Sequence, residues 1–302
     1  MGPAEADVKI CEMSPRDGLQ HLGGAHAVSE QRIVPVESRL RLIRALIDCW
    51  IRHVEVAAFV HPSAAPQMAL SDEVGRRVDP TAQAGLELAG LVPNDQGYER
   101  FARTGLNVVA VFPSANEAHC RQNFDNRGVL EVLDMAGHVA SRARRDGRLL
   151  RAHVSAAFQD IETSTRKSDV ATVVDVSRTL LVEYGCQYLT LADTNGTTNP
   201  ARVREILDAV GNAVGGLGRV GVHLHDRYGT GIANALAAWE HGVRIFDASV
   251  GGVGGSVAAN IVAGGTSPNI AGNIATEELV KMFEGMGVRT GIDLTSLVQN
   301  AG

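Results

Sequence analysis

A short apolar segment followed by a longer amphipathic segment recurs eight times along this chain. The expected strands are Val8–Met13, His53–Phe59, Leu86–Val92, Asn107–Pro113, Leu149–Ala156, Tyr188–Asp193, Arg219–Asp226 and Ile245–Gly251. The expected helices are Val36–Cys49, Ser71–Val78, Asp95–Thr104, Arg127–Arg145, Ser168–Tyr184, Pro200–Val214, Gly229–His241 and Thr276–Gly287. Short strands that are apolar on both faces and alternate with helices belong to helix-covered parallel sheets. The pattern therefore predicts an α/β fold with right-handed crossovers.

Eight repeats in 302 residues fit a closed (β/α)8 barrel, the TIM barrel, because such barrels run at ~250 residues as one domain. An open dinucleotide-binding sheet would carry G-x-G-x-x-G after its first strand. That junction instead reads Ser-Pro-Arg-Asp-Gly-Leu-Gln over residues 14–20. We expect a single catalytic domain over 1–302, with the strands inside 8–251, a long glycine-rich loop over 252–273 and the last helix over 275–287.

Charge, hydropathy and cysteine spacing limit the kinds of molecule that this chain is expected to bind. The net charge of −6 includes no long run of one sign, which argues against nucleic acid or an anionic membrane surface. No apolar stretch approaches the ~20 residues of a membrane span, and the acidic N-terminus lacks the apolar core of a signal peptide. The four cysteines have no paired spacing, which disfavours a disulfide framework or a zinc knuckle. A cytoplasmic protein that acts on a small molecule is expected.

Polar residues collect where the expected strands end, at the edge that carries the active site of a TIM barrel. They are Arg16, Asp17, Glu55, Asp193, His223, His225 and Asn273. Glu55 lies within the second strand, and Asn273 closes the loop after the eighth. We therefore expect these side chains to converge on one face of the barrel.

The segment His223-Leu224-His225 is the most informative of these. Side chains two residues apart in a strand point the same way, so both imidazoles should face the barrel mouth. A shared metal would keep both imidazoles neutral, whereas two protonated rings would repel each other. The alternative is two polar residues at a strand end, but Asp17 and Asn273 favour a metal site. Nitrogen and oxygen ligands without a thiolate suit Mg²⁺ or Mn²⁺, with Co²⁺ or Zn²⁺ as further options.

Arg16, Glu55 and Asp193 are candidate catalytic residues. The guanidinium of Arg16 suits a carboxylate or a developing enolate, and the alternative is a structural ion pair with Asp17. A buried carboxylate at Glu55 needs a partner, so Glu55 is interpreted as the partner of Arg16 in preference to a general base. Asp193 is either an acid/base group or an acceptor that supports the metal shell.

Several motifs together resemble one known family. They are Val8–Gln20, Phe59–Pro62 with Pro66–Met68, Val92–Asn94, Asp193–Thr194, His223–Gly229, Ala233–Asn234, Ser249–Gly255 and Gly272–Leu279. In this order they are similar to the 3-hydroxy-3-methylglutaryl-CoA lyases, members of the superfamily of metal-dependent lyase and Claisen-synthase barrels called DRE-TIM metallolyases. The resemblance extends over nearly the whole chain.

The resemblance implies a divalent-metal-dependent carbon–carbon lyase acting on a 3-hydroxy acid or thioester, with a CoA thioester as one such substrate. It implies metal ligation by Asp17, His223, His225 and Asn273, and substrate contacts from Arg16, Gln20 and Asn234. In these lyases the metal binds substrate oxygens as a Lewis acid. A homodimer is an assembly that barrels of this kind often form.

The chain departs from the family in the loop after the eighth strand. The lyases carry a catalytic cysteine there, and the corresponding residue here is Ser256. A serine hydroxyl has a far higher pKa than a thiol, so it is a poor substitute for proton transfer near neutral pH. The loop from Ser256 to Asn273 is also longer than in the family. The metal ligands are kept while the substrate-facing loops differ, and Ser256 stays a candidate catalytic residue.

Three other functions remain open. A Claisen-type synthase would condense an acyl-CoA with a 2-oxoacid, but such synthases usually have a longer chain with a regulatory domain. An aldolase would act on a free hydroxy-oxoacid, because the CoA-facing features are the altered ones. A non-catalytic barrel would keep the metal without turnover, although such a barrel would have no need of Arg16, Glu55 and Asp193.

Overall fold

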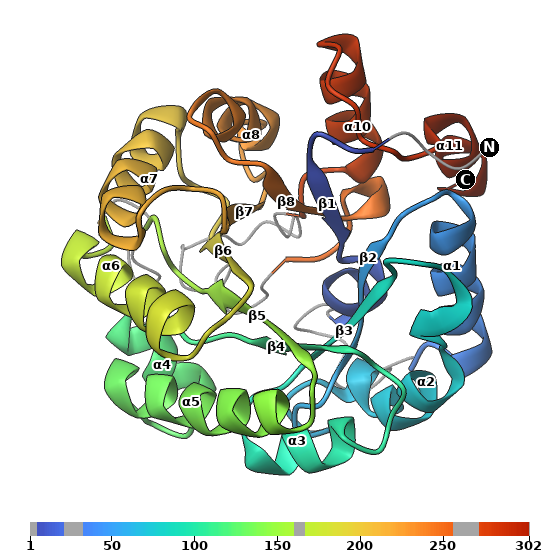
Figure 1. Cartoon of the computed structure of the whole chain (residues 1–302), viewed down its shortest axis with the longest axis horizontal. Coiled ribbons are helices and arrows are strands. Elements are labelled where there is room, and N and C mark those ends of the chain that lie inside the picture. The colour runs from blue at the N-terminus through green and yellow to red at the C-terminus, as the bar shows by residue number, and fades with distance from the viewer. Residues whose placement is uncertain (1–4, 21–32, 160–166, 256–271, 302) are drawn as a thin grey trace.

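Eight parallel strands close into a barrel in chain order in the computed structural model, and β8 pairs with β1. The structure describes residues 5–20, 33–159, 167–255 and 272–301. The strands are β1 (Lys9–Glu12), β2 (His53–Ala58), β3 (Glu87–Leu91), β4 (Val108–Val111), β5 (Leu149–Val154), β6 (Tyr188–Asp193), β7 (Val220–Leu224) and β8 (Ile245–Ala248). Figure 1 shows the strands at the centre of a ring of helices. The prediction of a single-domain TIM barrel is confirmed.

The helices cover the outside of the barrel (Figure 1). They are α1 (Val36–Asp48), α2 (Ser71–Arg77), α3 (Asp95–Phe101), α4 (Glu117–Asn123), α5 (Val129–Arg145), α6 (Val170–Arg178), α7 (Pro200–Val214), α8 (Gly231–Glu240), α10 (Thr276–Gly285) and α11 (Leu294–Ala301). A π-helical turn, η4 (Thr179–Glu183), extends α6 to nearly the predicted end. No helix in the described ranges is long and apolar enough to cross a bilayer.

Helices α4 and α11 were not predicted from the sequence. Helix α4 has seven residues, of which only His119 and Cys120 are buried, so its sequence shows no apolar period of 3.6. Its start is nevertheless encoded locally, because the side chain of Asn116 accepts a hydrogen bond from the backbone N–H of His119 at 2.9 Å. That bond satisfies one of the free N–H groups at the first turn.

Helix α7 shows how local sequence fixes an element. Its N-cap, Asn199, accepts hydrogen bonds from the backbone N–H groups of Ala201 and Arg202, both at 3.1 Å. Pro200 occupies the first helical position, where its missing N–H costs nothing. The helix ends at Gly215, whose φ of 79° lies in the left-handed region that glycine adopts without strain.

Several charged side chains point into the interior of the barrel. Glu55 of β2, Arg151 and His153 of β5, and Asp247 of β8 are all nearly or fully buried. Arg151 and His153 are two residues apart and so point the same way. Buried charges need partners, and these four groups pair with one another across the interior. All four cysteines are buried and in the thiol form.

Candidate metal and active site

The turn after β1 carries Arg16 and Asp17. It is a π-helical turn, η1 (Ser14–Gly18), in which the N–H groups of Arg16 and Gly18 both donate to the carbonyl of Met13, at 3.1 and 3.2 Å. Buried Glu12 anchors this turn, because its carboxylate accepts from the N–H of Ser14 at 2.8 Å. The same carboxylate accepts from the N–H of Val250 and the hydroxyl of Thr276. Glu12 therefore ties the loops after β1 and β8 together.

The two histidines at the end of β7 are held in one tautomer. Nδ1 of His223 lies 3.1 Å from Oδ2 of Asp247, and Nδ1 of His225 lies 2.8 Å from the backbone carbonyl oxygen of Asp193. Carboxylate and carbonyl oxygens only accept, so Nδ1 is the donor in both rings. In each neutral ring Nε2 then carries a lone pair that can bind a metal, which is the arrangement typical of metal-binding histidines.

Asn273 joins the same cluster through the loop that returns from β8. It forms a β-bridge with His225, and its amide donates to Oδ2 of Asp17 at 2.7 Å and to the carbonyl of Val253 at 2.9 Å. Gly254 allows this close approach, because a Cβ there would lie 2.4 Å from the Asn273 amide nitrogen and 2.6 Å from Oδ2 of Asp17. Its φ of 112° also favours glycine.

The donor set fits a divalent cation. Ligand atoms of Asp17, His223 and His225 lie within 4.8 Å of one another. Nε2 of His225 and Oδ1 of Asn273 are buried and have no hydrogen-bond partner among the described residues. Buried polar atoms rarely stay unpaired. A cation would satisfy both, and the four candidate side chains would offer it two nitrogen and two oxygen donors without a thiolate.

Charges around the cluster also suit a cation. Burial alone would raise the pKa of Asp17, but Arg16 and the two histidines hold it well below the usual range. Burial lowers the pKa of His223. For His225 the effect of burial is outweighed by Asp17, which raises the pKa. A bound divalent ion would replace the proton that Asp17 favours on His225.

Arg16 lies between two carboxylates. Its Nη1 donates to Oδ1 of Asp17 at 2.6 Å, and its Nε donates to Oε1 of Glu55 at 2.5 Å. Nη1 also lies 3.5 Å from the side-chain oxygen of Gln20, which places Gln20 beside the guanidinium. Burial opposes ionisation of Glu55, yet Arg16, His153 and Arg151 lower its pKa to about 2. Glu55 is therefore a carboxylate that orients Arg16, which matches the preferred interpretation of its role.

Asp193 supports the loop after β6 with its side chain and His225 with its carbonyl. Its carboxylate accepts from the N–H groups of Thr197 and Thr198 at 3.2 and 3.1 Å. Burial raises its pKa to about 6, which is in the range where a carboxyl group exchanges protons near neutral pH. Asp193 therefore holds the metal-ligand candidate His225 with its carbonyl and also carries a carboxyl group of raised pKa.

Asn234 lies on α8, under the same loop. It is fully buried, and its amide donates to the carbonyl of Thr198 at 3.2 Å. The described contacts therefore connect Asn234 to the loop after β6 and not to the cluster of metal-ligand candidates. Ser256 lies outside the described residues.

Sequence reasoning missed Glu12, Arg151, His153 and Asp247. Each is an ionisable residue at a buried position of a barrel strand. That signal was present in the sequence, because a charge in a buried strand requires a partner. The partner could not be identified, since Glu55 meets His153 and Asp247 meets Arg151 only across the closed barrel.

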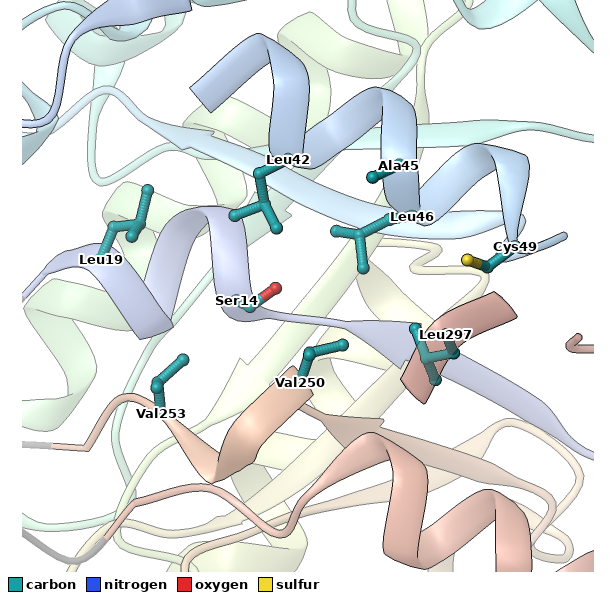
Figure 2. A pocket seen from close by; sticks show the side chains of 9 residues that line it. All are labelled: Ser14, Leu19, Leu42, Ala45, Leu46, Cys49, Val250, Val253 and Leu297. Atoms are coloured by element: carbon teal, nitrogen blue, oxygen red, sulfur yellow. The ribbon is translucent and has the colours of Figure 1, made fainter. Parts of the chain in front are cut away.

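A cavity of about 210 Å³ lies behind the turn that carries Arg16 and Asp17. Figure 2 shows its side chains on α1, α11, η1 and the 3-10 turn η5 (Val250–Gly252), and on the residues that directly follow α1, η1 and η5. The lining is Ser14, Leu19, Leu42, Ala45, Leu46, Cys49, Val250, Val253 and Leu297. The turn is therefore held by hydrogen bonds on the side that faces the barrel, and it borders a cavity on the side that faces α1 and α11.

Known proteins resemble this chain over almost its full length. Residues 7–301 match the HMGL-like family. The hydroxymethylglutaryl-CoA lyase of Pseudomonas mevalonii is 36% identical over 97% of this chain and 89% of its own. The (R)-citramalyl-CoA lyase of Chloroflexus aurantiacus is 34% identical over 96% of this chain and 88% of its own. The crystal structure of the Bacillus subtilis HMG-CoA lyase covers 100% of this chain and 93% of its own, with a TM-score of 0.86 and 32% identity.

Proposed function

The chain belongs to the HMGL-like family, and on that premise we propose that it is a divalent-metal-dependent lyase that cleaves a 3-hydroxyacyl-CoA related to 3-hydroxy-3-methylglutaryl-CoA. The family predicted from the sequence is confirmed. Two of the relatives described above are named as a hydroxymethylglutaryl-CoA lyase and a citramalyl-CoA lyase. The unpaired buried atoms of His225 and Asn273 are the observation that carries the metal dependence.

In the proposed reaction the 3-hydroxyl group loses its proton and the bond between C2 and C3 breaks. The electron pair of that bond forms a thioester enolate, C3 becomes a carbonyl, and the enolate then takes up a proton at C2. Asp17, His223, His225 and Asn273 would hold the divalent ion, which supplies Lewis-acid polarisation of the substrate oxygens.

Arg16 is positioned to stabilise the enolate. Glu55 and Asp17 fix the guanidinium through Nε and Nη1. A fixed donor aimed at developing negative charge in a site shielded from water stabilises the transition state more than the ground state. Asp193, with its pKa raised to about 6, is the proposed group for taking the hydroxyl proton.

The direct test is product formation from 3-hydroxy-3-methylglutaryl-CoA and from citramalyl-CoA, with Mg²⁺ or Mn²⁺ added to chelator-treated protein. We expect an acyl-CoA and a carbonyl compound from at least one of them, with turnover abolished by chelator and restored by metal. Metal binding without cleavage of either thioester would contradict the proposed substrate class. Turnover that persists in excess chelator, with no metal in the protein, would contradict the metal dependence.

Replacing Ser256 tests how the chain replaces the family's cysteine. We expect Ser256→Cys to raise cleavage of 3-hydroxy-3-methylglutaryl-CoA by at least ~10-fold, because a positioned acid contributes ~10²–10⁴-fold to proton transfer and a thiol has the lower pKa. Ser256→Ala is the matched control and should not raise the rate. An unchanged rate in Ser256→Cys would mean that another group delivers the proton to C2.

A further inference from the structure

His153 of β5 touches both carboxylates that hold the functional side chains of the site. Its Nε2 lies 3.0 Å from Oε2 of Glu55, and its Nδ1 lies 3.4 Å from Oδ2 of Asp247 and 2.8 Å from the hydroxyl of Thr190. The side chain is 6% exposed. A buried imidazole with partners on both nitrogens cannot rotate freely. The contacts of His153 with Glu55 and Asp247 therefore hold these two carboxylates at a set distance from each other.

The two carboxylates act on opposite halves of the site. Glu55 uses its other oxygen, Oε1, to hold Nε of Arg16 at 2.5 Å. Asp247 uses Oδ2 to hold Nδ1 of His223 at 3.1 Å. His153 therefore contacts both the partner of the guanidinium, Glu55, and the partner of a metal-ligand candidate, Asp247.

Arg151 also reaches both carboxylates, but differently. Its Nη2 lies 2.7 Å from Oδ1 of Asp247, and its Nη1 lies 3.9 Å from Oε2 of Glu55. Arg151 thus compensates charge mainly at Asp247, whereas His153 makes the closer contact with Glu55. The ring of His153 also packs edge-on against that of His223, with centroids 5.9 Å apart at 73°.

We propose that His153 is a positioning residue that couples Arg16 to His223 through Glu55 and Asp247. Residues that orient the ligands of a metal usually contribute 10–100-fold to metal affinity or activity. A purely structural residue would change stability alone. The kinetic part of this inference rests on the proposed lyase function, while the metal-affinity part does not.

The test compares His153→Phe with the wild-type protein, using Mn²⁺ affinity measured by calorimetry on chelator-treated protein. Phenylalanine keeps the ring but removes both nitrogens. We expect Mn²⁺ affinity to fall by roughly 10–100-fold, and kcat for the cleaved thioester to fall with little change in KM. His153→Gln, which can still hydrogen bond to a carboxylate, should recover part of both losses.

Val154→Ala is the matched control for stability. Val154 is fully buried in the same strand and points to the opposite face. It should lower the melting temperature while leaving Mn²⁺ affinity and kcat within about twofold of the wild type.

The outcomes separate the inference from the proposed function. If His153→Phe binds Mn²⁺ as tightly as the wild type and loses only melting temperature, His153 is structural and the inference is wrong. If the wild type binds Mn²⁺ but cleaves no thioester, the proposed function fails while the loss of affinity in His153→Phe still supports the coupling. If the wild type binds no Mn²⁺, both are overturned.

Discussion

His223→Ala is expected to lose metal binding and turnover together. The substitution removes Nε2, which the contact of Nδ1 with Asp247 directs toward Asp17 and His225. We expect Mn²⁺ affinity to fall by more than ~100-fold, beyond the 10–100-fold typical of losing a supporting residue. Turnover should fall by at least ~10³-fold, which corresponds to about 4 kcal/mol of transition-state stabilisation. Calorimetry with Mn²⁺ and a thioester cleavage assay provide the two measurements.

His138→Ala is the matched control for this substitution. His138 lies on α5 with a well-exposed side chain, 3.7 Å from carboxylates of Asp95 and Asp134. Surface pairs of this kind contribute little, so metal affinity and turnover should be unchanged. The melting temperature of metal-free His223→Ala must also be measured, because loss of the His223 contact leaves Asp247 with fewer partners. Full turnover by His223→Ala without bound metal would refute the assigned site.

Arg16→Met is expected to separate catalysis from metal binding. Methionine keeps the bulk of the side chain but removes the guanidinium, and all four ligand candidates are kept, although Asp17 loses its contact with Nη1. Removing one donor to a developing oxyanion typically costs ~10²–10³-fold in kcat, so we expect a fall of this size. Mn²⁺ affinity should stay within several-fold of wild type. A near-normal kcat would show that Arg16 only pairs with Asp17 and Glu55.

The Arg16→Met protein should also lose stability, for a reason unrelated to catalysis. It leaves Glu55 fully buried without its closest cation, and breaking a buried ion pair from one side costs about 3–5 kcal/mol. The double variant Arg16→Met/Glu55→Gln removes the charge on both sides and should recover part of the lost melting temperature. It should not recover kcat. Recovery of kcat in the double variant would assign the defect to the unpaired Glu55 carboxylate.

The fold was predictable because it depends on periodicity. Alternating apolar and amphipathic segments set the strands and helices, and helix covering with right-handed crossovers left few topologies. The His223 and His225 pair was predictable for the same reason, since residues two apart in a strand share a direction. Asp17 and Asn273 could be placed near the pair because both follow strands at one end of the barrel.

The contacts inside the barrel were not predictable in the same way. Glu55 and His153 are 98 residues apart in sequence, and their strands are not neighbours in the sheet. Their contact depends on how far each side chain reaches across the interior, which no local pattern encodes. The contact of Asn234 with Thr198 could not be predicted from the sequence either, because it depends on how α8 packs against the loop after β6.

The cavity behind the η1 turn makes hydrostatic pressure an informative variable. Unfolding eliminates internal voids, so pressure favours the unfolded chain in proportion to the void volume lost. Ala45→Leu adds three carbons at the cavity wall and should reduce the volume change of unfolding, measured by tryptophan fluorescence under pressure. Because the void adjoins the turn that carries Asp17, compression should change Mn²⁺ affinity at pressures below those that unfold the barrel. A metal affinity that changes at such pressures would link the packing behind the η1 turn to the position of Asp17.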